Sequence, residues 1–140
     1  MVDVVEEAVK VYDSGNYEQP IKPYIHPSGE GSRIIAMPVF LGGSFQAAGI
    51  KWISSYPKNI SDGLPRSYST TILNDAMTGE PICIFESAIL SSIRTAAVSG
   101  LLLKSTVSSM VVGIIGCGRI GRMHAEMICE IYRSRVKSIT

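Results

Sequence analysis

The feature that most constrains the fold is a glycine-rich loop near the end of the 140-residue chain, with the sequence Gly116-Cys117-Gly118-Arg119-Ile120-Gly121. A continuous apolar run at residues 111–115 precedes this loop, as expected of a buried parallel strand. Helical spacing of apolar residues predicts a helix at about 120–133, and a second strand begins near residue 136. The order of strand, glycine loop, helix and strand is typical of the first βαβ unit of a dinucleotide-binding fold.

The three glycines of the loop have separate physical roles in such a fold. Gly116 permits the tight turn, Gly118 lets the backbone approach a pyrophosphate, and Gly121 lets the helix pack closely on the strand. The helix N-terminus then offers unpaired N–H groups and a favourable dipole to the anion. We therefore predict dinucleotide binding, with a turn that binds nothing as the alternative. The acid that would bind the ribose, and so distinguish NAD from NADP, is expected beyond Thr140, and we expect the chain to be the N-terminal fragment of a longer enzyme.

The region before the loop has a mixed character. Residues 33–37 are predicted to form a strand that Pro38 ends, and a hairpin loop is predicted at 74–81. The chain is therefore expected to be of the α/β class, with a mixed α+β domain at 1–108 and the start of a Rossmann domain at 109–140. The remaining predicted elements are helices at 2–13 and 87–104, irregular chain at 19–32, and strands at 47–54, 70–73 and 82–85.

Composition narrows the class of protein. Hydrophobic residues make up 46% of the chain and charged residues 18%, as in globular proteins, and the net charge of +1 is spread without a basic tract. We expect neither nucleic-acid nor membrane binding. Cys83, Cys117 and Cys129 form no CxxC pair, which indicates no disulfide scaffold or metal site and favours a reducing cytoplasm. His26 and His124 are predicted to be structural or exposed.

A few basic residues are candidates for a ligand site. Lys51 lies between two large apolar residues in a predicted strand, where an unpaired lysine is costly unless its side chain reaches the solvated face. Arg94 lies among small residues of a predicted helix and can hold a carboxylate or phosphate bidentately, although a solvated helix face is the alternative. Arg33 and Arg66 are further candidates, for which an ordinary surface position is favoured.

Five short segments together resemble the ornithine cyclodeaminase/mu-crystallin family. The resemblance extends from about Tyr12 to the end of the chain. Within the family it is closest to the dehydrogenases of 2,3-diaminopropionate (siderophore precursor) biosynthesis, although residues 56–59 and 63–65 are more similar to ornithine cyclodeaminase. The five segments are residues 33–38 (RIIAMP), 49–52 (GIKW), 72–75 (ILND), 94–99 (RTAAVS) and 116–118 (GCG).

This resemblance implies a two-domain, homodimeric NAD enzyme in which residues 1–108 bind substrate and form the dimer. Arg33 and Lys51 match the family's substrate-binding arginine and lysine, and Arg94 matches the arginine that meets both substrate and nicotinamide cofactor. Arg66 falls near a cofactor position that carries threonine in ornithine cyclodeaminase. The family's catalytic aspartate is expected beyond the residues given. The implied cofactor contacts in the loop are Gly116, Gly118, Arg119, Ile120 and Gly121.

The implied reaction is NAD-dependent oxidation of an amino-acid C–N bond to an imine, with Lys51 as a catalytic residue that supports the imine chemistry. In the siderophore branch, water then splits N-[(2S)-2-amino-2-carboxyethyl]-L-glutamate into 2,3-diaminopropionate and 2-oxoglutarate. One alternative is conversion of L-ornithine to L-proline and ammonia. Others are a mu-crystallin-like protein that binds the cofactor without turnover, and a fragment without function.

Overall fold

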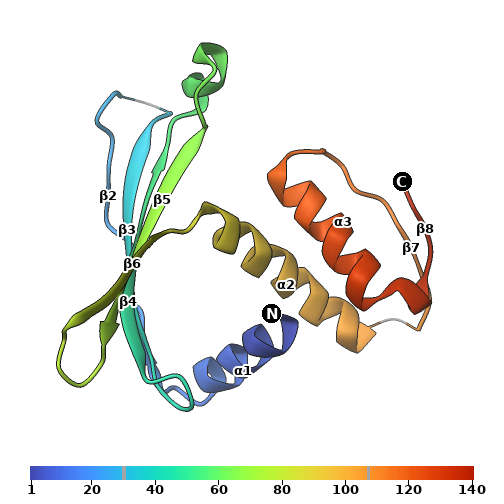
Figure 1. Ribbon diagram of the computed structural model, residues 1–140, viewed down its shortest axis with the longest axis horizontal. Coiled ribbons are helices and arrows are strands. Elements are labelled where there is room, and N and C mark those ends of the chain that lie inside the picture. Colours follow the sequence, from blue (N-terminus) through green and yellow to red (C-terminus); the bar gives the residue numbers. More distant parts are fainter. Residues whose placement is uncertain (30, 107) are drawn as a thin grey trace. The chain divides into compact units, whose positions relative to one another are not determined.

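A computed structural model describes residues 1–29, 31–106 and 108–140. The chain forms two compact units, which we call the sheet unit (Lys10–Ala88) and the glycine-loop unit (Met1–Val9 with Ile89–Thr140). Antiparallel and parallel strand pairs combine with helices, which confirms the predicted α/β class (Figure 1). The predicted domains at 1–108 and 109–140 were defined by function and not by compactness, and their boundary stays a prediction. No helix among the described residues is long and apolar enough to cross a membrane.

The sheet unit is built on one antiparallel sheet with the strand order β1-β3-β4-β5-β6, and β2 also pairs with β3 (Figure 1). The predicted strands are confirmed but extend further than expected, and two short strands were not predicted, β2 within the stretch expected to be irregular. The strands are β1 (Tyr17–Glu18), β2 (Tyr24–Ile25), β3 (Arg33–Leu41), β4 (Ala47–Ser55), β5 (Ser67–Asp75) and β6 (Pro81–Glu86).

Pro38 does not end its strand, so that prediction was wrong. The N–H of Ala36 points to the outer edge of β3, where it bonds the carbonyl oxygen of Pro23 at 3.1 Å. Successive N–H groups alternate in direction along a strand, so the nitrogen of Pro38 also faces this outer edge. The short partners β1 and β2 pair with β3 only at residues 40–41 and 34–35. The missing N–H of proline therefore breaks no bond to β4, and β3 continues to Leu41.

The hairpin predicted at residues 74–81 is confirmed and is closed by Asp75. Its Oδ1 atom accepts bonds from the backbone N–H groups of Met77 and Thr78, each at 2.8 Å, and from the Thr78 hydroxyl at 3.0 Å. The backbone bond from Thr78 leads the set of bonds that lower the pKa of the Asp75 carboxyl. The connection between β4 and β5 contains the 3₁₀ helix η1 (Pro57–Asp62).

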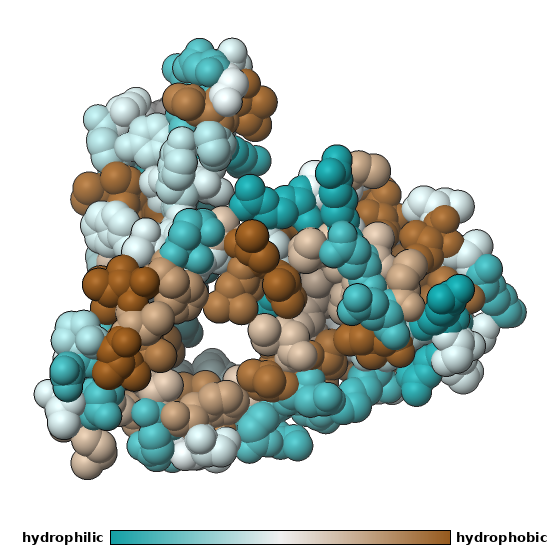
Figure 2. All heavy atoms as spheres, in the orientation of Figure 1, coloured by the Kyte–Doolittle hydropathy of each residue, from teal (hydrophilic) through white to brown (hydrophobic). Residues whose placement is uncertain are grey.

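The register of β3, β4 and β5 sorts their side chains onto two faces. Lys51 pairs directly with Met37 on β3 and Thr71 on β5, so these three residues point to one side, which we call the Lys51 face. The other side, the Trp52 face, carries Trp52 and Tyr68, whose residues are 48% and 52% exposed. Figure 2 shows hydrophobic side chains at the surface over the region of the sheet.

The glycine-loop unit contains three helices and a parallel strand pair (Figure 1). Strand β7 pairs in parallel with β8, which confirms the predicted strand–loop–helix–strand order. Strand β7 is shorter than the predicted strand at 111–115, but beyond its end the N–H of Ile114 still donates to the carbonyl oxygen of Thr140 at 2.8 Å. The elements are residues 2–9 of α1 (Val2–Asp13), α2 (Ala88–Thr106), β7 (Met110–Val112), α3 (Arg119–Ile131), the 3₁₀ helix η2 (Arg133–Arg135) and β8 (Val136–Ile139).

Small residues on α2 let the three helices of this unit approach closely. Ala96 and Ala97 are each 1% exposed. A Cβ atom added to Gly100 would lie 2.9 Å from the Met127 sulfur on α3 and 2.9 Å from a methyl group of Val2 on α1. Ala96 and Ala97 therefore belong to the core of the unit together with Val2 and Met127, and Gly100 leaves room for both of these larger side chains.

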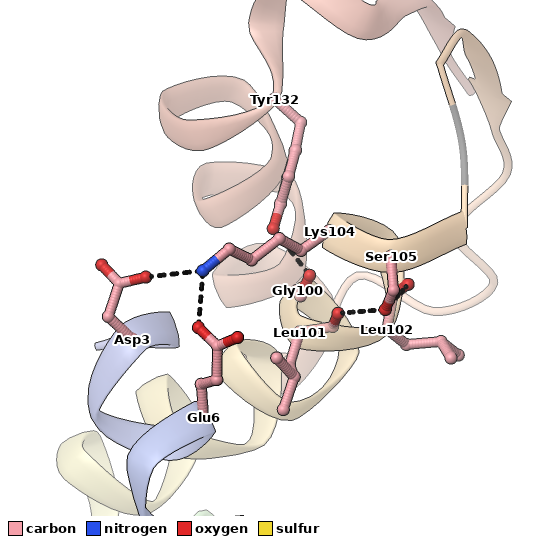
Figure 3. A network of polar contacts seen from close by, with 8 residues as sticks. All are labelled: Asp3, Glu6, Gly100, Leu101, Leu102, Lys104, Ser105 and Tyr132. Atoms are coloured by element: carbon pink, nitrogen blue, oxygen red, sulfur yellow. Dashed lines mark hydrogen bonds and ion pairs between the residues drawn. The ribbon is translucent and has the colours of Figure 1, made fainter.

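Three polar contacts connect α2 to α1 and to Tyr132, the residue that follows α3 (Figure 3). The buried Tyr132 hydroxyl donates to the carbonyl oxygen of Gly100 at 2.6 Å. The Lys104 ammonium group bonds Glu6 at 2.5 Å and Asp3 at 3.1 Å, and these carboxylates, Glu6 foremost, raise the pKa of Lys104. The ion pairs are exposed, so the buried tyrosine bond is expected to contribute more to stability.

Replacement of Tyr132 by phenylalanine should lower the free energy of unfolding by about 1 kcal/mol, because the Gly100 carbonyl loses its buried donor. Urea denaturation would measure this change. Tyr68→Phe is the matched control, since Tyr68 is half-exposed on the sheet and its loss of a hydroxyl should have little effect. Equal effects of the two substitutions would contradict the assigned role of Tyr132.

Candidate functional site

The glycine loop leads directly into α3. Gly116 has a φ angle of +99°, a conformation that side-chain-bearing residues rarely adopt. Gly118 is extended, with φ −70° and ψ −178°, and caps the N-terminus of α3, whose first residue is Arg119. The turn therefore delivers the chain from a strand into a helix within a few residues, and the first N–H groups of α3 lie at the loop.

Gly118 and Gly121 differ in their surroundings. A Cβ atom added at Gly121 would overlap the carbonyl oxygen of Gly116, so this position packs the helix against the turn. A Cβ atom added at Gly118 would meet nothing within 4 Å. The backbone at Gly118 thus faces open space, which leaves room for a phosphate group at the start of α3.

Side chains from α3 bond both the turn and the neighbouring helix α2. The Arg122 Nε–H donates to the carbonyl oxygen of Cys117 at 3.1 Å. The His124 Nδ1 atom lies 2.8 Å from the carbonyl oxygen of Ile120, and its Nε2 atom lies 2.9 Å from the Ser99 hydroxyl on α2. From the sequence, His124 was predicted only to be structural or exposed. Its signal was the spacing of four residues from Ile120, which places a histidine ring beside a carbonyl of the preceding turn.

Arg33 and Lys51 occupy the Lys51 face of the sheet. Arg33, Met37 and the residue between them at position 35 alternate along β3, so Arg33 shares the face of Met37 and of its partner Lys51. Lys51 is half-buried at the centre of the sheet, and Arg33 is exposed at the start of β3. Lys51 therefore points away from the apolar Trp52 face, as alternation along the strand allowed.

Arg94 belongs to the glycine-loop unit and lies exposed on the first half of α2. The structure thus groups Arg94 with the glycine loop in one unit, and Arg33 with Lys51 on one face in the other. Arg66 is exposed just before β5. Among the residues that the structure describes, no group of three histidine, cysteine, aspartate or glutamate side chains could hold a metal ion.

Comparison with known proteins identifies related sequences along the whole chain. Residues 1–140 match the sequence model of the ornithine cyclodeaminase/mu-crystallin family. The chain is 38% identical, over 92% of its length, to the N-((2S)-2-amino-2-carboxyethyl)-L-glutamate dehydrogenase of Staphylococcus aureus, of which it covers 40%. It is 34% identical, over 94% of its length, to the alanine dehydrogenase of Archaeoglobus fulgidus, of which it also covers 40%.

Solved structures show the same fold. The Thermococcus litoralis Delta(1)-pyrroline-2-carboxylate reductase, in complex with NADH and L-proline, matches with a TM-score of 0.87 and 30% identity over 99% of this chain and 42% of that one. An archaeal alanine dehydrogenase dimer with bound NAD matches with a TM-score of 0.83 and 33% identity, over 98% of this chain and 42% of that one. The chain therefore spans about 40% of the length of these relatives.

Substitution of Gly121 by alanine should destabilise the protein by more than about 2 kcal/mol, because the added Cβ atom overlaps backbone that cannot move aside cheaply. Gly118→Ala is the control and should change the free energy of unfolding by less than about 0.5 kcal/mol, since its Cβ atom enters open space. Chemical denaturation of both variants measures the difference. A Gly121→Ala variant as stable as Gly118→Ala would contradict the close approach of α3 to the turn.

Proposed function

This chain belongs to the ornithine cyclodeaminase/mu-crystallin family, and we propose that the protein containing it uses NAD to oxidise an amino-acid C–N bond to an imine. The glycine loop is the observation that carries the proposal. Its backbone at Gly118 faces open space at the start of α3, while Gly121 packs against Gly116. The two solved relatives named above contain NADH or NAD, which supports the same cofactor here.

The substrate that we propose is N-[(2S)-2-amino-2-carboxyethyl]-L-glutamate, with 2,3-diaminopropionate and 2-oxoglutarate as products. The 38% identical relative of that activity supports this choice. Such a substrate carries several carboxylates, and the basic residues assigned to bind them are Arg33, Lys51 and Arg94. Oxidation of a simpler amino acid is the second candidate, favoured by the 34% identical alanine dehydrogenase.

Each of the three basic residues has a role in this proposal. Bound NAD would accept the hydride from the carbon that carries the amine. Arg33 and Arg94 hold carboxylates by paired N–H donors, which orients that carbon. Lys51, half-buried among the side chains of its sheet face, donates to the substrate and supports formation and hydrolysis of the imine. The proposed roles of Arg119 and Ile120 belong to their backbone, which would contact the pyrophosphate of bound NAD.

We further propose a cytoplasmic homodimer, in which the Trp52 face of one copy packs on that of another. Large apolar side chains stand exposed there, including Trp52 (48%) and Ile84 (66%), and an apolar face of this kind favours a protein partner. The archaeal alanine dehydrogenase, a dimer, supports a second copy as that partner. The cytoplasm is supported by Cys83, Cys117 and Cys129, which are free thiols in the structure.

Lys51→Ala should abolish turnover, measured as NADH formation from the amino-acid substrate, because the side chain that supports the imine is removed. Lys58→Ala is the control, since Lys58 is an exposed lysine of η1 with no assigned role. Wild-type activity of Lys51→Ala would refute the catalytic role of Lys51. A wild-type protein that binds NAD and turns over no amino acid would favour the mu-crystallin-like alternative.

Ile84→Lys should convert the dimer into a monomer, because the substitution places a charge in the proposed apolar interface. Sedimentation velocity measures the change. Ile60→Lys is the matched control, because Ile60 is 64% exposed on η1, outside the Trp52 face, and its substitution should leave the dimer intact. A dimer that persists in Ile84→Lys would place the interface elsewhere.

A further inference from the structure

Both ring nitrogens of His124 are engaged, and their partners determine which nitrogen carries the proton. The carbonyl oxygen of Ile120, 2.8 Å from Nδ1, can only accept, so Nδ1 carries a hydrogen and donates it. In the neutral ring Nε2 is then an acceptor, and the Ser99 hydroxyl at 2.9 Å donates to it. The chain of bonds therefore runs in one direction, from Ser99 through His124 to the backbone of Ile120.

This chain of bonds joins two helices that carry different groups assigned to the cofactor. Ser99 lies on α2, five residues after Arg94, and Ile120 is both the second residue of α3 and part of the glycine-loop sequence. Figure 1 shows α2 and α3 side by side, and the close approach of Gly100 to Met127 places them in contact. The bond between Ser99 and His124 therefore restrains α3 from sliding or rotating relative to α2.

We propose that Ser99 and His124 are positioning residues for the cofactor, which keep the N-terminus of α3 in register with the helix that bears Arg94. This inference rests on the proposed NAD function. The backbone N–H groups of a helix N-terminus bind an anion only if they point at it, and they are fixed to the helix that carries them. Because Ile120 lies in that first turn, a bond to its carbonyl oxygen acts directly on the direction of these groups.

Substitutions at the two residues separate the two bonds. His124→Asn keeps an amide nitrogen at the place of Nδ1 and loses the reach to Ser99, whereas His124→Gln places its amide at the reach of Nε2. Ser99→Ala removes the donor alone. Ser105→Ala is the matched control, because Ser105 also lies on α2 but its hydroxyl donates to the carbonyl oxygens of Leu101 and Leu102 in its own helix.

The test measures NAD affinity by titration calorimetry and steady-state kinetics in the protein that contains this chain, at its full natural length. Ser99→Ala and His124→Asn should each weaken NAD binding by about three- to tenfold, the effect of one lost hydrogen bond, and raise the KM for NAD. The kcat at saturating NAD and the KM for the amino acid should stay unchanged. The double variant should be no weaker than either single variant, because both remove the same bond.

Several outcomes would overturn the proposal. Variants that lose stability but keep the wild-type affinity for NAD would show a packing role only. His124→Gln should bind NAD with an affinity closer to wild type than that of His124→Asn, and the reverse order would contradict the proposal. Nitrogen-15 NMR of the wild-type ring should show the proton on Nδ1, and a proton on Nε2 would contradict the described chain of bonds. A wild-type protein that binds no NAD would refute the proposed function, whereas wild-type binding with unaffected variants would refute this inference alone.

Discussion

The close approach of Gly121 to the carbonyl oxygen of Gly116 is the contact on which the glycine-loop unit depends. It allows a helix to begin directly against the turn that follows a strand. At Gly118, the N-cap of that helix, an added Cβ atom would meet nothing within 4 Å, so the backbone there faces open space. Arg122 on α3 then donates to the carbonyl oxygen of Cys117 in the same turn, so a side chain of this helix also stabilises the turn.

The sheet unit depends in a similar way on its register. The pairing of Lys51 with Met37 and Thr71 puts a half-buried lysine on one face and leaves Trp52 on the other. A slip of one residue would exchange the two faces. One alignment of strands therefore sets both the direction of the proposed catalytic group and the apolar surface proposed for a second copy of the chain.

Local patterns in the sequence predicted the local structure well. The helix at 2–13 and the glycine loop followed from spacing and from the conformations that glycine permits, and both are confirmed. The predicted end of a strand at Pro38 was wrong, because the pairing of the outer edge of β3 depends on β1 and β2, which lie about 10 to 24 positions earlier in the sequence. The bond between Ser99 and His124 likewise forms only after two helices pack, so sequence spacing alone could not reveal it. The assigned roles of Arg33, Lys51 and Arg94 stay predictions.

The open space at Gly118 has a consequence for how such a loop can change during evolution. In the proposed site the cofactor is bound through backbone N–H groups, so binding does not depend on the identity of the intervening side chains. Cys117 and Arg119 are exposed. Selection is then expected to keep glycine at positions 116, 118 and 121 and to tolerate substitutions at the residues between them. The chemistry of the loop depends on missing side chains, so the glycines are the positions where substitutions are expected to be rarest.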